Sequence, residues 1–256
     1  MTSLYYLDQN PLGNQAVVFL HGLGANGSSW FYQFEALKQE PFRLIAPDFP
    51  GFGNSRYDGR RWNFHRIAKD VAGLIDELNI APVYLVGLSM GGVIAQQLVL
   101  DYPNLVQKLV LVSTFSVLKP ASVSQWFYFL QRIMVVHTMG LATQAKIVAR
   151  RIFPDPDQQQ LREMAETQIS QADPKAYRAA MRSLSMFDSR KRLREITSPT
   201  LVLSGANDST VAPSRQKLLA DGILGSKHVI IPGAGHAVAI DHHEMFNQYL
   251  LEFIKG

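Results

Sequence analysis

The chain of 256 residues contains no cysteine, which excludes disulfide bonds, a thiolate nucleophile, zinc ribbons and iron–sulfur ligation together. It also lacks any stretch of about 18 apolar residues, so we expect no membrane-spanning helix. The first ten residues have neither a basic start nor an apolar run, which favours a cytoplasmic protein. No basic motif with interleaved aromatics indicates nucleic-acid binding. The sequence shows no metal, flavin or nicotinamide motif, and we expect no cofactor.

Charge is scarce and unevenly placed. Charged residues make up 18% of the chain, and the net charge is +4. Between Phe115 and Glu195 there are 13 Lys and Arg against seven Asp and Glu, whereas the remainder carries 12 against 14. A solvated helical surface is the ordinary explanation of such a run. The open alternative is a basic surface for an anionic partner, such as an acidic carrier protein.

What the sequence does contain is an alternation of short apolar runs with amphipathic stretches. The runs are apolar throughout, as in strands of a parallel sheet that is covered on both faces. Their order predicts an α/β fold with a mostly parallel, doubly wound sheet. We expect strands at Ala16–Leu20, Phe42–Ala46, Val83–Val86, Leu109–Val112, Thr200–Leu203 and His228–Ile231. We expect helices at Phe64–Leu78, Met90–Asp101, Ser214–Ala220 and Glu244–Ile254.

This alternation stops in the middle of the chain. Residues 116–194 show no convincing strand, and proline and glycine break their helical stretches. We therefore expect residues 1–115 and 195–256 to form an α/β core and residues 116–194 to form an inserted, all-helical cap. Most large apolar side chains of the insertion should pack inside it, and a few should line a cleft. The candidates for that lining are Trp126, Phe127, Met134 and Met139.

The segment Gly87-Leu88-Ser89-Met90-Gly91 has the form G-x-S-x-G. Alone it is a weak motif, but here an apolar strand ends just before it and a helix begins just after the serine. This is the context in which the motif forms a nucleophile elbow, a strained turn that exposes the serine hydroxyl. Glycine on either side avoids clashes in such a turn. Ser89 is therefore the candidate nucleophile.

A serine hydroxyl needs a base, and the base needs a third group that orients it. Asp208 follows one predicted strand, and His236 follows the next, so both belong to the same sheet edge as Ser89. Asp241 lacks such a strand before it and is the weaker acid. The other histidines fit less well at this edge, namely His65, His137, His228, His242 and His243.

Two backbone N–H groups are needed to bind the oxyanion of an acyl-transfer reaction. One candidate is the N–H of Met90, which follows the nucleophile. The other is the N–H of Leu23, in the loop His21-Gly22-Leu23-Gly24 after the first predicted strand. His21 itself is more simply explained as a histidine that braces this loop.

Together these motifs resemble the α/β-hydrolase superfamily, in order and over nearly the whole chain outside the insertion. The segments that carry the resemblance are His21–Gly24, Asp48–Ser55, Gly87–Gly92, Gly205–Asp208 and Gly235-His236. The resemblance implies a triad of Ser89, Asp208 and His236, an oxyanion hole at Leu23 and Met90, and a helical cap that sets substrate choice.

Departures from family patterns narrow the expected activity. A serine nucleophile argues against epoxide hydrolases and haloalkane dehalogenases, which use aspartate. Leu88 and Ala237 differ from the carbon–carbon bond hydrolases, and Met90 differs from proline iminopeptidases. We expect a serine carboxylesterase acting on short- to medium-chain esters. A lactonase or enol-lactonase and a carrier-protein methyl ester esterase remain alternatives, and so does a receptor-like protein that binds a ligand and keeps a slow triad.

Overall fold

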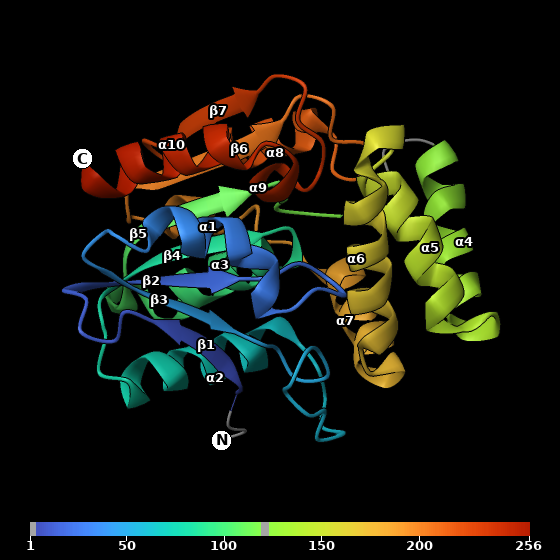
Figure 1. The fold of residues 1–256 in the computed structure, drawn as a ribbon, viewed down its shortest axis with the longest axis horizontal. Coiled ribbons are helices and arrows are strands. Elements are labelled where there is room, and N and C mark those ends of the chain that lie inside the picture. The colour runs from blue at the N-terminus through green and yellow to red at the C-terminus, as the bar shows by residue number, and fades with distance from the viewer. Residues whose placement is uncertain (1–3, 119–122) are drawn as a thin grey trace.

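The computed structural model of the chain describes residues 4–118 and 123–256 (Figure 1). Its seven strands form one sheet in the order β1-β3-β2-β4-β5-β6-β7. Of these strands, only β1 runs antiparallel to its neighbour, which confirms the predicted mostly parallel sheet. The strands are β1 (Tyr6–Gln9), β2 (Gln15–Leu20), β3 (Phe42–Pro47), β4 (Val83–Leu88), β5 (Val106–Val112), β6 (Thr200–Gly205) and β7 (Lys227–Ile231).

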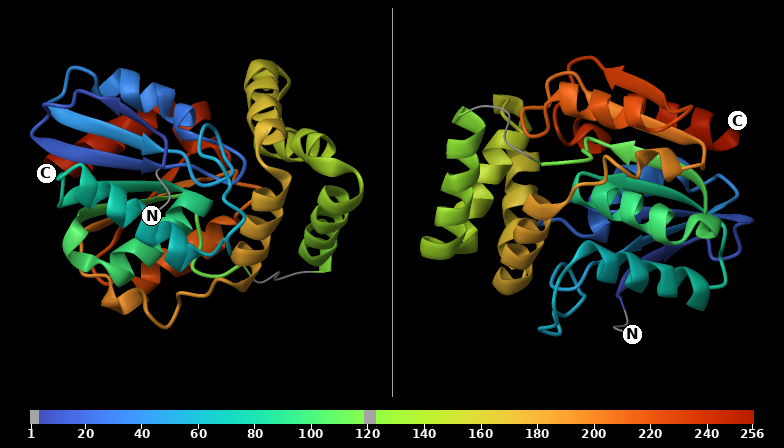
Figure 2. Two further views of the ribbon diagram at one scale, coloured as in Figure 1. Left: turned by 90° about the horizontal axis from the view of Figure 1, so that it is seen from below. Right: turned by 180° about the vertical axis from the view of Figure 1, so that it is seen from behind.

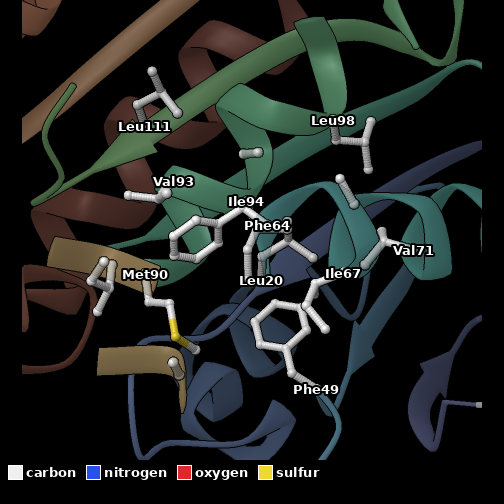
Figure 3. Close-up of a cluster of buried hydrophobic side chains, with 14 of the residues drawn as sticks. Leu20, Phe49, Phe64, Ile67, Val71, Met90, Val93, Ile94, Leu98 and Leu111 are labelled. Carbon is white, nitrogen blue, oxygen red and sulfur yellow. The ribbon is translucent and has the colours of Figure 1, made fainter. Parts of the chain in front are cut away.

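Helices cover both faces of the sheet, as the apolar character of its strands requires. One face packs against α2 (Phe64–Glu77), α3 (Met90–Asp101) and α8 (Pro213–Gly222). The opposite face packs against α1 (Phe31–Leu37), α9 (Val238–Asp241) and α10 (His243–Lys255). The core of the first face is shown in Figure 3, where Met90 and Ile94 of α3 lie among Leu20, Phe49 and Phe64.

The chain between β5 and β6 forms four helices beyond one end of the sheet (Figure 2). They are α4 (Val123–Thr138), α5 (Gly140–Ile152), α6 (Gln159–Gln171) and α7 (Pro174–Met186). In Figure 1 they stand side by side at the right, across the end to which the parallel strands point. Within the described ranges, no helix of the protein is long and apolar enough to cross a membrane.

The two ends of the α4–α7 segment join the sheet side by side. We call this connection, which contains Ser116, Val117, Asp188 and Ser189, the neck. Val117 and Asp188 form an isolated antiparallel bridge. Ser189 N donates to Ser116 O at 2.9 Å, and Ser189 Oγ donates to Gln96 Oε1 of α3 at 2.8 Å. Buried apolar side chains of α5, α6 and α7 belong to the same cluster as those of α2 and α3. These helices are therefore packed firmly on the sheet layer.

The strands and α-helices with predicted bounds agree with the observed ones within a few residues, but one strand and two short α-helices of the described chain escaped prediction. β1 is an edge strand of mixed polarity, whose pairing partner β3 lies far ahead in the sequence. α1 and α9 have seven and four residues, too few for a helical period to stand out. None of the three contributes a predicted site residue.

Candidate active site

Ser89 lies at the turn between β4 and α3, in a backbone conformation that residues other than glycine rarely adopt. Its φ is 53° and its ψ is −111°. The surrounding structure fixes this strained residue: Ser89 N donates to Val112 O at 2.8 Å, and Thr114 Oγ1 donates to Ser89 O at 2.7 Å. Strain held in place this way is typical of a nucleophile elbow.

The two glycines of the motif are required by close backbone packing. A Cβ on Gly87 would collide with the carbonyl oxygen of Gly91. A Cβ on Gly91 would collide with the carbonyl oxygen of Leu20 at the end of β2. Because these obstacles are backbone atoms, neither can move aside at low cost. The sequence pattern therefore reflects the geometry that the turn needs.

His236 and Asp208 meet at the same sheet edge, as predicted. Asp208 follows β6 and His236 follows β7, and the distance from His236 Nδ1 to Asp208 Oδ2 is 2.9 Å. Both side chains are almost completely buried, with 6% and 0% exposed. Because this contact uses Nδ1, the other ring nitrogen, Nε2, is available to act on a further group.

Asp208 is held on every side by donors. Thr210 N and Val211 N each donate to Oδ1 at 2.8 Å. Gln216 Nε2, from α8, donates to Oδ2 at 3.0 Å. Sequence reasoning missed Gln216, because a glutamine inside a helix carries no motif. These bonds orient the carboxylate toward His236.

Ser89 and His236 line one cavity of about 220 Å³. No hydrogen bond between Ser89 and His236 is among those of the described residues, and such contacts are often loose before substrate binds. The cavity walls come from the loops at the strand ends and from helices α4 to α9. Apart from Ser89 and His236, its lining includes Leu23, Trp30, Leu88, Phe115, Leu118, Val148, Ile152, Phe153, Ile169, Leu184, Val211 and Ile240, with Arg132, Arg151 and Arg215.

The loop that carries Leu23 lies against the serine. A Cβ on Gly22 would lie 3.8 Å from Ser89 Cβ, and Leu23 lines the cavity beside it. Met90 is completely buried, and its N–H belongs to the first residue of α3. N–H groups in a first helical turn have no partner within the helix, so they suit an anion.

His21 braces this loop from behind. Phe49 N donates to His21 Nε2 at 3.1 Å, and His21 Nδ1 donates to Gly22 O at 2.8 Å. The ring is completely buried, and this burial lowers its pKa from 6.5 to about 4. Asp48 adds a second brace, because it accepts from Gly27 N and Asn54 N, each at 2.7 Å. The neutral His21 ring thus holds the loop, and the buried Asp48 carboxyl group ties Gly27, just after the loop, to Asn54.

The predicted substrate lining differs from the observed one. Phe127, Met134 and Met139 are 69%, 60% and 63% exposed, and none of them lines the cavity that holds Ser89. Phe127 and Met134 instead line a shallow groove on the outer side of α4. The side chain of Trp126 lies outside the described residues. The prediction that Phe127, Met134 and Met139 line the cleft is wrong, and no methionine of the described chain lines the cavity.

Other polar candidates have separate roles. Asp241 accepts from Gly235 N at 3.0 Å and so supports the loop before His236, without touching its ring in any described bond. His228 lies within β7 and bonds to Ser204 Oγ at 2.8 Å. His65 is paired with Asp101 on the surface. Among the described residues, no group of three His, Asp or Glu side chains could hold a metal ion.

Comparison with known proteins decides the family. A sequence model of the alpha/beta hydrolase fold matches residues 15–243. The chain belongs to the α/β-hydrolase family. The resemblance carried by the sequence motifs is thereby confirmed, and the insertion between β5 and β6 falls inside the matched region.

Several known proteins resemble this chain over nearly its whole length. The "Putative carbamate hydrolase RutD" of Variovorax paradoxus is 31% identical over 98% of this chain and 96% of its own. An esterase from Exiguobacterium antarcticum superimposes with a TM-score of 0.92 at 25% identity, covering 99% and 96% of the two chains. The enol-lactonase from Burkholderia xenovorans LB400 gives a TM-score of 0.90 at 26% identity, with coverage of 99% and 96%.

Proposed function

We propose that this α/β-hydrolase is a serine carboxylesterase that hydrolyses short- to medium-chain carboxylic esters through an acyl-enzyme on Ser89. The observation that carries the proposal is that Ser89, in its strained conformation, lines the same cavity as His236, which is paired with the buried Asp208. Ser89, Asp208 and His236 would form the triad. The backbone N–H groups of Leu23 and Met90 would form the oxyanion hole.

In the first half-reaction, Ser89 Oγ attacks the ester carbonyl carbon while His236 Nε2 takes its proton. Asp208 holds the imidazole with its proton on Nδ1 and stabilises the imidazolium that forms. The carbonyl electron pair moves onto oxygen, where the two N–H groups stabilise it. When this intermediate collapses, His236 returns the proton to the departing alcohol, and the acyl group stays on Ser89.

In the second half-reaction, water replaces the alcohol. His236 takes a proton from water, whose oxygen attacks the acyl carbon and forms a second oxyanion. Collapse breaks the bond to Ser89 Oγ, which recovers its proton from His236, and the carboxylic acid leaves. The reaction thus needs only groups that the described site provides.

The size of the cavity supports a small substrate. Its volume of about 220 Å³ is somewhat larger than the roughly 150 Å³ that accommodates benzene in a protein interior. Drug-sized ligands occupy pockets of about 300 Å³ or more. A short acyl chain fits this space, whereas a long one exceeds it. Each methylene that does fit adds about 0.8 kcal/mol of favourable burial.

The relatives support ester-like bonds and also keep an alternative open. Their names include an esterase, an enol-lactonase and a carbamate hydrolase. A lactone is an internal ester, and the same triad and oxyanion hole would open it. The enol-lactonase with a TM-score of 0.90 specifically favours lactone opening as the second candidate function.

The decisive experiment is a panel of p-nitrophenyl esters from acetate to palmitate, together with simple lactones and aminoacyl amides. We expect kcat/KM to rise from acetate to butyrate or hexanoate and to fall sharply for palmitate. Faster opening of a lactone than of every ester would favour the second candidate. A proline amide cleaved faster than any ester would contradict both.

A receptor-like function is separable in the same assay. With ester in large excess over protein, an enzyme releases many equivalents of p-nitrophenol. A binding protein with a slow triad releases one equivalent and stops.

A further inference from the structure

The cavity that contains Ser89 has a strongly cationic lining. In the part of the chain that the structure describes, its ionisable lining residues are Arg132, Arg151, Arg215 and His236. No Asp or Glu of the described residues lines it; Asp208 sits behind His236. The three arginines come from three different helices, α4, α5 and α8, so the tertiary fold, rather than one helix face, brings them to the same cavity.

Bonds to neutral oxygens help to fix the position of each guanidinium. Arg132 Nη2 donates to Tyr177 Oη of α7 at 3.1 Å. Arg215 Nη1 donates to Val117 O in the neck at 3.0 Å. Arg151 Nη2 donates to Ser209 O, and Ser209 Oγ donates back to Arg151 O at 3.2 Å. A positioned, planar guanidinium loses little freedom when it then binds an anion.

We propose that the cavity selects an ester or lactone whose acyl part ends in a second, free carboxylate, and that Arg132, Arg151 and Arg215 recognise this carboxylate. The inference rests on the proposed function of Ser89 and gives it a substrate class. Half-esters of short dicarboxylic acids, with four to six carbons in the acid, have the size and charge that the cavity takes. The acyl part is the better place for the anchor, because it stays on the enzyme through both half-reactions.

Two physical arguments favour an anionic ligand over a neutral one. Arginine binds carboxylates through charge-assisted hydrogen bonds, which are stronger than hydrogen bonds between neutral groups. The guanidinium of Arg215 already shows the effect of its surroundings, since burial lowers its pKa from the usual value. A carboxylate would add charge-assisted hydrogen bonds in these surroundings, whereas a neutral acyl chain would not.

The competing explanation is that the arginines only brace the helices. Structural bracing would affect all substrates equally, so the test uses a ratio. We compare kcat/KM for monomethyl glutarate with kcat/KM for dimethyl glutarate, which has the same chain without the free charge. The ratio should exceed one in the wild-type protein. It should fall about tenfold to a hundredfold in Arg132→Gln and in Arg215→Gln, as expected for losing a charged hydrogen bond.

Arg150→Gln is the matched control. Arg150 precedes Arg151 in α5, is exposed, and does not line the cavity, so its substitution removes the same charge without touching the site. The ratio should stay at its wild-type value. Stoichiometric labelling of Ser89 by a fluorophosphonate in every variant shows that the site remains folded.

A measurement on the wild-type protein covers the case in which a variant fails to fold. Glutarate should inhibit hydrolysis of p-nitrophenyl butyrate competitively, and glutaramide should inhibit at least tenfold more weakly. An unchanged ratio in both variants, or equal inhibition by acid and amide, overturns the carboxylate assignment. Those results would leave the esterase proposal intact, whereas absence of labelling and of all ester turnover would overturn the proposed function itself.

Discussion

The carboxyl edge of the sheet and the α4–α7 helices build the same cavity by different means. At the sheet edge, Ser89, Asp208 and His236 lie in the turns and loops that follow β4, β6 and β7, so each strand fixes where the side chain stands. On the helices, Arg132 and Arg151 reach the cavity only because of the rotation of each helix about its axis. We therefore propose that the sheet edge carries out the reaction and that the helices select the substrate.

The largest expected effect would test the first half of this comparison. Ser89→Ala removes the nucleophile and should lower kcat by about 10⁶, as removal of a serine nucleophile does elsewhere. The fold should persist, because alanine removes only the hydroxyl group and keeps the rest of the side chain in place. Mass spectrometry after fluorophosphonate treatment should find one label, on Ser89. Ser113→Ala, another buried serine with positive φ at a strand end, serves as the control.

A smaller loss is expected at the acid. Asp208→Asn should lower kcat about 10⁴-fold, because an amide favours the imidazole tautomer that cannot accept the serine proton. Urea titration should show a folded protein. Asp241→Asn is the paired control, since an asparagine oxygen can still accept from Gly235 N. Near wild-type activity in Asp208→Asn, with a severe loss in Asp241→Asn, would move the acid to Asp241.

The same contrast explains what could be predicted from the sequence. The strands were predictable because runs of three or more consecutive apolar residues bounded by turn residues leave few alternatives. Once strands are assigned, parallel pairing brings their carboxyl ends to one edge, and Ser89, Asp208 and His236 follow. The supports of Asp208 were not predictable in full: Gln216 reaches it from a helix, and only the tertiary fold brings the two together.

The lining residues on α4 were beyond sequence reasoning for a related cause. Phe127, Leu130 and Met134 lie on one apolar face of α4, which is exposed. A second set of apolar residues, which includes Val135 and Val136, forms its buried side. Periodicity shows that faces exist but does not tell which one turns toward the cavity. Because α4 has apolar residues on two sides, the prediction placed the cavity lining on the wrong side of the helix.

The bracing of the sheet edge can be tested through pH. The pKa of His21 is about 4 in the folded protein, below its ordinary 6.5, so the unfolded chain binds a proton first as pH falls. Stability that is present above pH 6.5 is lost progressively as pH falls toward 4, by about 3 kcal/mol. His21→Asn should be less stable at neutral pH but should lose less on acidification. Urea titrations of both proteins at pH 7 and pH 4.5 measure the difference, and parallel losses would contradict it.

The smallest expected effect concerns the outer surface of the helices. The exposed side chains of Lys146, Arg150 and Arg182 contribute to its basic charge. If this surface docks an acidic carrier protein, KM for a carrier-bound ester should rise roughly tenfold between low and high salt, because exposed charges are screened. Hydrolysis of p-nitrophenyl butyrate should not respond. Monomethyl glutarate should respond only weakly, since its charge would be enclosed with Arg132 and Arg215. Charge reversal of the three exposed residues should abolish the salt effect on the carrier substrate alone. Equal salt dependence for the carrier-bound ester and for p-nitrophenyl butyrate would mean that this surface only carries solvated charge. Substrate choice would then depend on the cavity alone.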